Sequence, residues 1–82
     1  MPLYMDVHRK VKGATARAVA EAHKKDLQHQ AKHGVKYLNY WYDQRTKTIF
    51  CLVDAPNKEA AAKVRKEAHG LVANEIHGVS QG

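Results

Sequence analysis

Apolar and polar residues alternate along the first stretch of the chain, residues 3–8. Strict alternation is the period of a half-buried β-strand, in which successive side chains point to opposite faces of a sheet. The two faces would carry Leu3, Met5 and Val7 on one side and Tyr4, Asp6 and His8 on the other. We expect the apolar set to face the protein core. The phenol, the carboxylate and the imidazole would then lie together on the open face of the sheet.

The hydrophobic period lengthens after this strand. Thr15 is a suitable N-cap, and residues 16–32 contain no Gly or Pro, which predicts a helix of about four turns. Apolar residues recur in this segment at three- and four-residue spacing, as on the buried stripe of an amphipathic helix. The stripe consists of Ala16, Val19, Ala20, His23 and Leu27. His23 thus falls on the buried side, where a histidine hydrogen-bonded to Asp26 is a commoner arrangement than a metal ligand.

His29 and His33 lie four residues apart, a spacing that allows two imidazoles on one helix face to share a metal ion. His33 directly precedes Gly34, the expected end of the helix. Histidines at that position commonly complement the helix dipole and the free carbonyl groups. We therefore favour a structural role for this pair, with metal chelation as the alternative.

Residues 35–42 and 48–53 are rich in β-branched and aromatic side chains and flank a polar segment, which predicts a hairpin. The second of these strands is apolar on both faces. Ile49, Cys51 and Val53 lie on one face, and Phe50 and Leu52 on the other. One layer of helices covers only one face of a sheet. A second copy of the same sheet is the simplest cover for the other face, which predicts a homodimer.

A second helix is expected over residues 58–69 after the N-cap Asn57, and residues 71–79 carry a weak strand pattern. The order is then βαββαβ. Its preferred solution is the α+β ferredoxin-like fold, a four-stranded antiparallel sheet with two helices on one face. We predict one ferredoxin-like domain over residues 1–79, followed by a frayed end at 80–82.

The first and last strands of a ferredoxin-like sheet are neighbours. Glu75 and His77 alternate around Ile76, so they would point to the face opposite Ile76. We expect them beside Asp6 and His8 on the open face.

Length and charge restrict the possible functions. A domain of 82 residues hides only about 60% of the surface of its unfolded chain, so its core is thin and dimerisation would stabilise it. The net charge of +6 suggests a nucleic-acid partner, but the 14 Lys and Arg residues are scattered, and only residues 9–12 form a cluster. The single cysteine excludes an intramolecular disulfide and favours a reducing cytoplasm. No apolar run reaches the length of a membrane span.

Several separated segments resemble a family of small bacterial nickel-binding proteins, otherwise described as a domain of unknown function. The segments are Pro2 to His8, Ala20 to His23 with Asp26 and Leu27, Gly34 to Tyr37 with Tyr40 and Trp41, Phe50 to Val53 with Ala55 and Pro56, and Glu67 to Val72. The resemblance covers nearly the whole chain. It implies a ferredoxin-like protomer that pairs as a dimeric α/β barrel and binds nickel.

The chain departs from the family pattern at one position of interest. Family members often carry a histidine four residues before the position of His69, and Arg65 stands there in this chain. A cation one helical turn from a candidate ligand would repel a metal ion.

Metal binding is the function that the sequence favours. Carboxylate and imidazole donors suit nickel, zinc or copper, and the expected ligands are Asp6 and His8, with Glu75 and His69 as further contributors. The protein would store, buffer or respond to nickel or another divalent transition metal.

Two other classes of function are weaker. In a small enzyme, Asp6 and His8 could act as acid and base in a cavity enclosed by the dimer, but no cofactor or nucleophile motif supports this. In an RNA- or DNA-binding protein, Tyr4, Tyr40 and Tyr42 could stack on bases, but the aromatic motif of such sheets is absent. We therefore rank metal binding first, catalysis second and nucleic-acid binding third, and we expect no membrane association.

Overall fold

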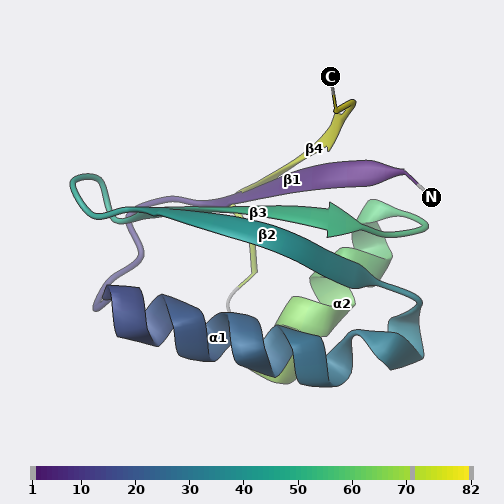
Figure 1. Ribbon diagram of the computed structural model, residues 1–82, viewed down its shortest axis with the longest axis horizontal. Coiled ribbons are helices and arrows are strands. Elements are labelled where there is room, and N and C mark those ends of the chain that lie inside the picture. The colour runs from purple at the N-terminus through teal and green to yellow at the C-terminus, as the bar shows by residue number, and fades with distance from the viewer. Residues whose placement is uncertain (1, 71, 82) are drawn as a thin grey trace.

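The computed structural model describes residues 2–70 and 72–81. Its helices and strands follow the order βαββαβ, with one turn of 3-10 helix after the first α-helix. They are β1 (Leu3–His8), α1 (Ala16–His29), η1 (Ala31–His33), β2 (Lys36–Asp43), β3 (Thr48–Asp54), α2 (Lys58–Ala68) and β4 (Glu75–Val79). Both helices lie on one side of the sheet (Figure 1). This is the ferredoxin-like fold that the sequence predicts.

The sheet has the strand order β2-β3-β1-β4, and every neighbouring pair is antiparallel. The strands β3 and β1 are therefore central. Asp6 lies opposite Cys51 of β3 on one side and Ile76 of β4 on the other. A side chain that projects from the middle of β1 toward the helices is consequently enclosed by both neighbouring strands and the helix layer.

Both helices begin at the residues that the sequence marks, whereas α1 ends at His29, before the predicted end at residue 32. The amide of Ala18 donates to Thr15 Oγ1 at 3.1 Å, and the amide of Ala60 donates to Asn57 Oδ1 at 2.8 Å, so both predicted N-caps are confirmed. The 3-10 turn ends at Gly34, whose φ of 66° lies in the left-handed region that glycine adopts without strain.

The main core lies between the helices and the sheet. Its buried members are Ala14, Val19, Val35, Tyr37, Ile49, Cys51, Val53, Ala55, Ala61 and Val64. The strand β3 supplies three of these residues, all from the face on which the sequence places them. Leu52, from the other face of β3, is also buried but lies outside this cluster. The prediction that β3 is apolar on both faces is confirmed.

The orientation predicted for β1 is wrong. Asp6 and His8 are buried on the helix side, at 1% and 2% exposure, and the carboxylate of Asp6 is ion-paired with Arg65 of α2. Because side chains alternate along a strand, Leu3, Met5 and Val7 lie on the open face. The polar face of β1 turns inward because Arg65 of α2 provides a partner for the carboxylate of Asp6 there.

The buried stripe of α1 also differs from the prediction. Val19 and Asp26 are the residues of α1 that are buried, whereas Leu27 is 44% exposed. Asp26 is ion-paired with Arg65, and this contact turns α1 so that its inner line runs through Val19, His23 and Asp26.

Two expectations involve residues outside the described part of the chain. These are Leu71, in the expected weak strand, and Gly82, in the expected frayed end. Within the described residues, no helix combines the length and the apolar character needed to cross a membrane.

Candidate metal centre

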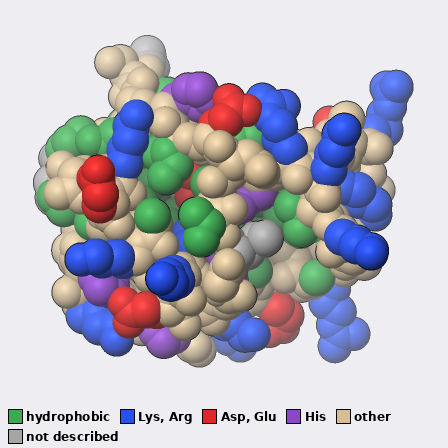
Figure 2. All heavy atoms as spheres, turned by 180° about the vertical axis from the view of Figure 1, so that it is seen from behind, with side chains coloured by type: hydrophobic (Ala, Val, Ile, Leu, Met, Phe, Trp, Pro, Cys, Tyr) green, Lys and Arg blue, Asp and Glu red, His purple; other side chains and the backbone are tan. Residues whose placement is uncertain are grey.

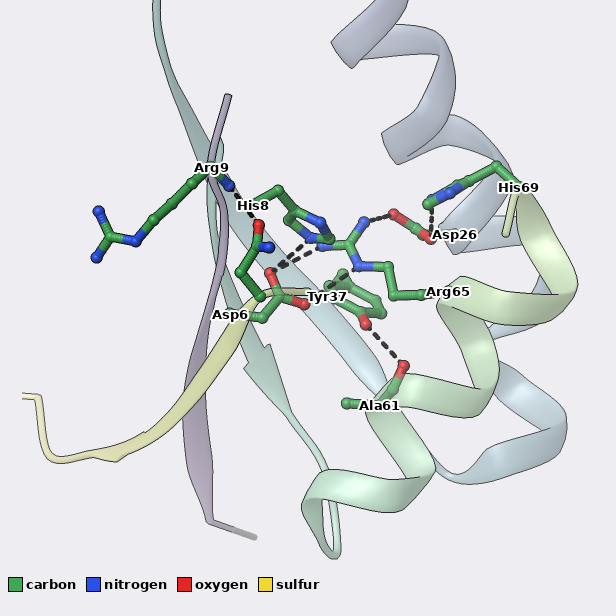
Figure 3. Close-up of polar contacts among 9 residues, drawn as sticks. Asp6, His8, Arg9, Asp26, Tyr37, Ala61, Arg65 and His69 are labelled. Atoms are coloured by element: carbon green, nitrogen blue, oxygen red, sulfur yellow. Dashed lines mark hydrogen bonds and ion pairs between the residues drawn. The ribbon is translucent and has the colours of Figure 1, made fainter. Parts of the chain in front are cut away.

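A network of buried charges lies between the sheet and the helices (Figure 3). Arg65 extends from α2 toward β1, where its Nε and Nη2 donate to the two carboxylate oxygens of Asp6, each at 3.1 Å. Its Nη1 donates to Asp26 Oδ2 of α1. One guanidinium therefore joins β1, α1 and α2 through charge-assisted hydrogen bonds.

Further contacts hold this network in place. Asp26 Oδ1 accepts a hydrogen bond from His69 Nε2 at 3.0 Å. The guanidinium carbon of Arg65 lies 4.3 Å from the centre of the Tyr37 ring, and Tyr37 donates its hydroxyl to the carbonyl of Ala61 at 3.1 Å. Arg65 is thus fixed by carboxylates on two sides and by an aromatic face on another.

The network remains ionised despite its burial. Burial alone would raise the pKa of Asp6, but the imidazole of His8 and the charge and hydrogen bonds of Arg65 outweigh this effect, so the pKa of Asp6 is lowered. Burial likewise opposes the charge of Arg65, but Asp6 and the other surrounding groups raise the pKa of the guanidinium overall.

His8 lies beside this network but forms no hydrogen bond to it. Its side chain is 2% exposed, and neither ring nitrogen has a hydrogen-bond partner among the described residues. Nε2 approaches Asp6 Oδ1 at 3.4 Å, an ion-pair distance that lacks hydrogen-bond geometry. One donor atom each from Asp6, His8 and Cys51 lie within 4.8 Å of one another. This spacing allows three donors to surround one ion.

A small cavity adjoins these donors. Its volume of about 20 Å³ is sufficient for one water molecule or one metal ion. The lining is rich in nitrogen and sulfur groups: it consists of His8, Val19, Ala22, His23, Tyr40, Ile49, Cys51, Arg65 and His69. Three imidazoles and one thiol therefore line a space of ionic size.

Two titratable side chains that line the cavity, His23 of α1 and Cys51 of β3, are both neutral at neutral pH. Burial, together with the charge of Arg65, lowers the pKa of His23 although Asp26 opposes this effect, and its buried Nδ1 has no hydrogen-bond partner among the described residues. The ring of His23 lies 4.7 Å from that of Tyr40. Burial raises the pKa of the Cys51 thiol to about 12. Neutral imidazole is the form that coordinates metals, whereas Cys51 must lose its proton to do so.

Comparisons with known proteins identify the family. A family model described as "Nickel responsive protein SCO4226-like" matches residues 4–79. The chain belongs to this SCO4226-like family. A solved structure described as "Crystal structure analysis of SCO4226 from Streptomyces coelicolor A3(2)" is 35% identical in sequence and aligns over 98% of both chains with a TM-score of 0.89. No curated protein matches the chain.

In this SCO4226-like protein, three of the four ligand residues expected from sequence belong to one neighbourhood. Asp6 lies beside His8, and His69 contacts Asp26 of the same network. Glu75 is elsewhere, because it pairs with Val7 in the sheet register and thus lies on the open face. There Glu75 accepts hydrogen bonds from Arg9 at 2.5 Å and from His77 at 2.9 Å. The expectation that Glu75 lies beside Asp6 and His8 is wrong.

The histidine pair of α1 is also separated by the fold. His29 ends α1, while His33 belongs to the following 3-10 turn, where its Nε2 contacts Glu67 of α2. This contact links the end of the first helix to the second helix. It supports the structural role that the sequence analysis favours for His33.

The buried site includes groups that the sequence analysis assigned to other roles. Asp26 was expected to partner His23 but binds Arg65 and His69, and Cys51 was regarded only as a strand residue. Arg65, which was expected to repel a metal ion near His69, lines the same cavity as His69 and has both carboxylates as partners. A signal was present: residues 61, 65 and 69 follow a four-residue spacing that places Arg65 and His69 on the same face as the buried Ala61.

Proposed function

We propose that the protein binds nickel, or another divalent transition metal ion, in the cavity beside His8, and that it stores, buffers or responds to this metal. The observation that carries the proposal is the buried imidazole of His8, which has no hydrogen-bond partner among the described residues. A buried polar group without a partner costs about 1–3 kcal/mol. A metal ion would satisfy the imidazole and recover this free energy.

The donor set fits a borderline metal ion. His8 and His23 present buried nitrogens that have no hydrogen-bond partner among the described residues, and Cys51 adds sulfur, a combination that suits nickel, zinc or copper. His69 would be an additional ligand, because a carboxylate such as Asp26 commonly orients a metal-binding imidazole. Asp6 also places a carboxylate oxygen within 4.8 Å of the donor atoms of His8 and Cys51.

We further propose a cytoplasmic location. Cys51 is buried and forms no disulfide, and a reducing compartment would keep it available as a donor. The family description, which mentions a nickel response, agrees with a role in intracellular metal handling.

Absorption spectroscopy tests the presence of nickel at this site. Protein without a polyhistidine tag should bind about one nickel ion per chain and develop a sulfur-to-nickel charge-transfer band, because Cys51 lies among the donors. The Cys51→Ala variant should retain its fold and lose the band. A tag-free wild-type protein that binds no nickel at millimolar concentration would contradict the proposed function.

The position of Asp6 and His8 and the size of the adjoining cavity argue against the enzymatic alternative. Asp6 and His8 lie on the helix side of the sheet, so they do not line a cavity formed by pairing two open faces. The cavity beside them, at about 20 Å³, is far smaller than the roughly 300–1,000 Å³ of small-molecule sites. No observation in the described residues favours catalysis over metal binding.

The position of three tyrosines argues against the nucleic-acid alternative. Tyr4, Tyr40 and Tyr42 were expected on the open face but pack against the helix-side core. On the face shown in Figure 2, Lys and Arg side chains are dispersed, with acidic and hydrophobic side chains between them. The residues that were expected to stack on bases are therefore not available on the open face.

We also propose a homodimer in which two open sheet faces pair. This face carries Met5, Val7, Trp41, Phe50 and Leu52, as their positions in the strand register show. Trp41 is 51% exposed in the single protomer. Because tryptophan is enriched at protein interfaces, this exposure favours a partner on the open face. A second copy of this face would cover these apolar side chains symmetrically.

Trp41→Asp should separate the proposed dimer without unfolding the chain, because Trp41 is 51% exposed in the single protomer. A carboxylate at the centre of an apolar interface would be buried without a partner. Sedimentation at low micromolar concentration should show twice the 9.2 kDa chain mass for the wild type and the single mass for the variant. Leu27→Asp is the matched control, since Leu27 is 44% exposed on α1 in the helix layer. A monomeric wild type would contradict the dimer.

A further inference from the structure

Arg65 lines the candidate metal cavity and holds two buried carboxylates, those of Asp6 and Asp26. Its bonds to the two oxygens of Asp6 measure 3.1 Å each, and a third N–H group donates to Asp26. The side chain is only 4% exposed and lies against the ring of Tyr37. Both carboxylates thus already have a permanent cation as their partner.

We propose that Arg65 determines which class of metal ion the cavity accepts. This inference rests on the proposed function, because it concerns the same cavity. With the carboxylates held by Arg65, the available donors are the imidazoles of His8 and His23 and the sulfur of Cys51. The site therefore takes borderline and soft ions such as nickel, zinc, copper and cadmium, and it rejects magnesium, calcium and manganese.

The chemical basis is the preference of each ion for its donor atoms. Magnesium, calcium and manganese favour carboxylate, carbonyl and water oxygens, whereas imidazole and thiolate favour the later transition metals. The guanidinium of Arg65 lines the cavity, so its positive charge also repels every divalent ion that enters. Only ions that form strong bonds to nitrogen and sulfur can offset this repulsion.

The net charge of the three buried residues explains why Arg65 would determine which ions bind. Asp6, Asp26 and Arg65 together carry a net charge of −1, which becomes −2 when the arginine is neutralised. Two adjacent buried carboxylates without a counter-ion would be an attractive site for an oxygen-preferring cation. In the native network, Arg65 occupies the position of that cation.

The test compares nickel with manganese on tag-free protein. Nickel binding is measured by calorimetry and manganese binding by the loss of the electron paramagnetic resonance signal of the free aqueous ion. The wild type should bind nickel and leave manganese free, and excess manganese should not displace nickel. Arg65→Gln should bind manganese and should bind nickel at least tenfold more tightly, because both carboxylates become available.

Two further variants separate the release of Asp6 from a change in charge. The double variant Arg65→Gln with Asp26→Asn has the same net charge at these three positions as the wild type, yet it frees Asp6. It should also bind manganese, and it remains informative if Arg65→Gln does not fold. Arg17→Gln removes one positive charge from the exposed surface of α1 and should behave like the wild type.

The outcomes distinguish this inference from the proposed function. A wild type that binds nickel and manganese equally well would overturn the role of Arg65 whether or not the variants fold. Manganese binding in Arg65→Gln but not in the double variant would assign the effect to charge alone and overturn it too. A wild type without nickel binding, combined with manganese binding by both Arg65 variants, would overturn the proposed function and support the role of Arg65.

Discussion

Replacing Arg65 by methionine is expected to lower the free energy of unfolding by about 3–5 kcal/mol. The methionine side chain would fill much of the same volume, so the loss would come mainly from charge. Asp6 and Asp26 are 1% and 0% exposed and would remain buried without their cation. Removing one partner of a buried ion pair is strongly destabilising because the other charge is left uncompensated. Equilibrium unfolding in urea measures this change directly.

The matched control is Arg9→Met on the opposite face of the sheet. Arg9 also forms an ion pair with a carboxylate, at 2.5 Å from Glu75, but its side chain is 56% exposed. Water compensates exposed charges, so this variant should unfold near the wild-type midpoint. Equal losses in the two variants would show that the buried network has no special role in stability.

The destabilisation in Arg65→Met should depend on pH. Without the guanidinium, burial raises the pKa of the carboxyl groups above the unfolded value of about 3.9, so their charge costs stability above that range. As the pH falls toward about 4, protonation removes the uncompensated charge from the variant. The wild type behaves oppositely, since the pKa of Asp6 is lowered and its stabilisation is lost only as the pH falls below about 3.8. The difference between the two proteins should therefore shrink in acid.

The fold could be predicted because its signals are local. The N-caps Thr15 and Asn57, the glycine at position 34 and the change of hydrophobic period each depend on neighbouring residues. Together they define the order βαββαβ, for which the ferredoxin-like fold is the preferred arrangement. The face of β1 is different. Alternation separates Met5 from Asp6, but it does not determine which of the two points toward the helices.

That choice depends on partners far away in the sequence. Asp6 is separated by 59 residues from Arg65, and Asp26 by 39. Burying a carboxylate is unfavourable alone and becomes acceptable only when such partners converge on it. The same convergence brings His8 and Cys51 together, although these two residues are far apart in the sequence. The pairing of first and last strands was predicted correctly, yet it placed Glu75 beside Val7 on the open face.

Replacing His8 by leucine is expected to weaken nickel binding at least a hundredfold, about 2.8 kcal/mol. Changes to residues that only orient a ligand commonly reduce metal affinity by about 10–100-fold, so the loss of a direct donor should reach the upper end of this range or exceed it. Leucine is preferable to alanine because His8 is 2% exposed, and a small side chain would leave a cavity in the core. Leucine retains the volume and removes both nitrogens.

Calorimetric titration of tag-free protein with nickel at neutral pH is the most direct test of the metal site. The proteins to compare are the wild type, His8→Leu, and a double variant in which His29 and His33 are both changed to glutamine. We expect the wild type and the double variant to bind about one ion per chain with similar affinity, and His8→Leu to lose binding. Undiminished binding by His8→Leu together with its loss in the double variant would show that nickel binds at the end of α1 instead of in the buried cavity.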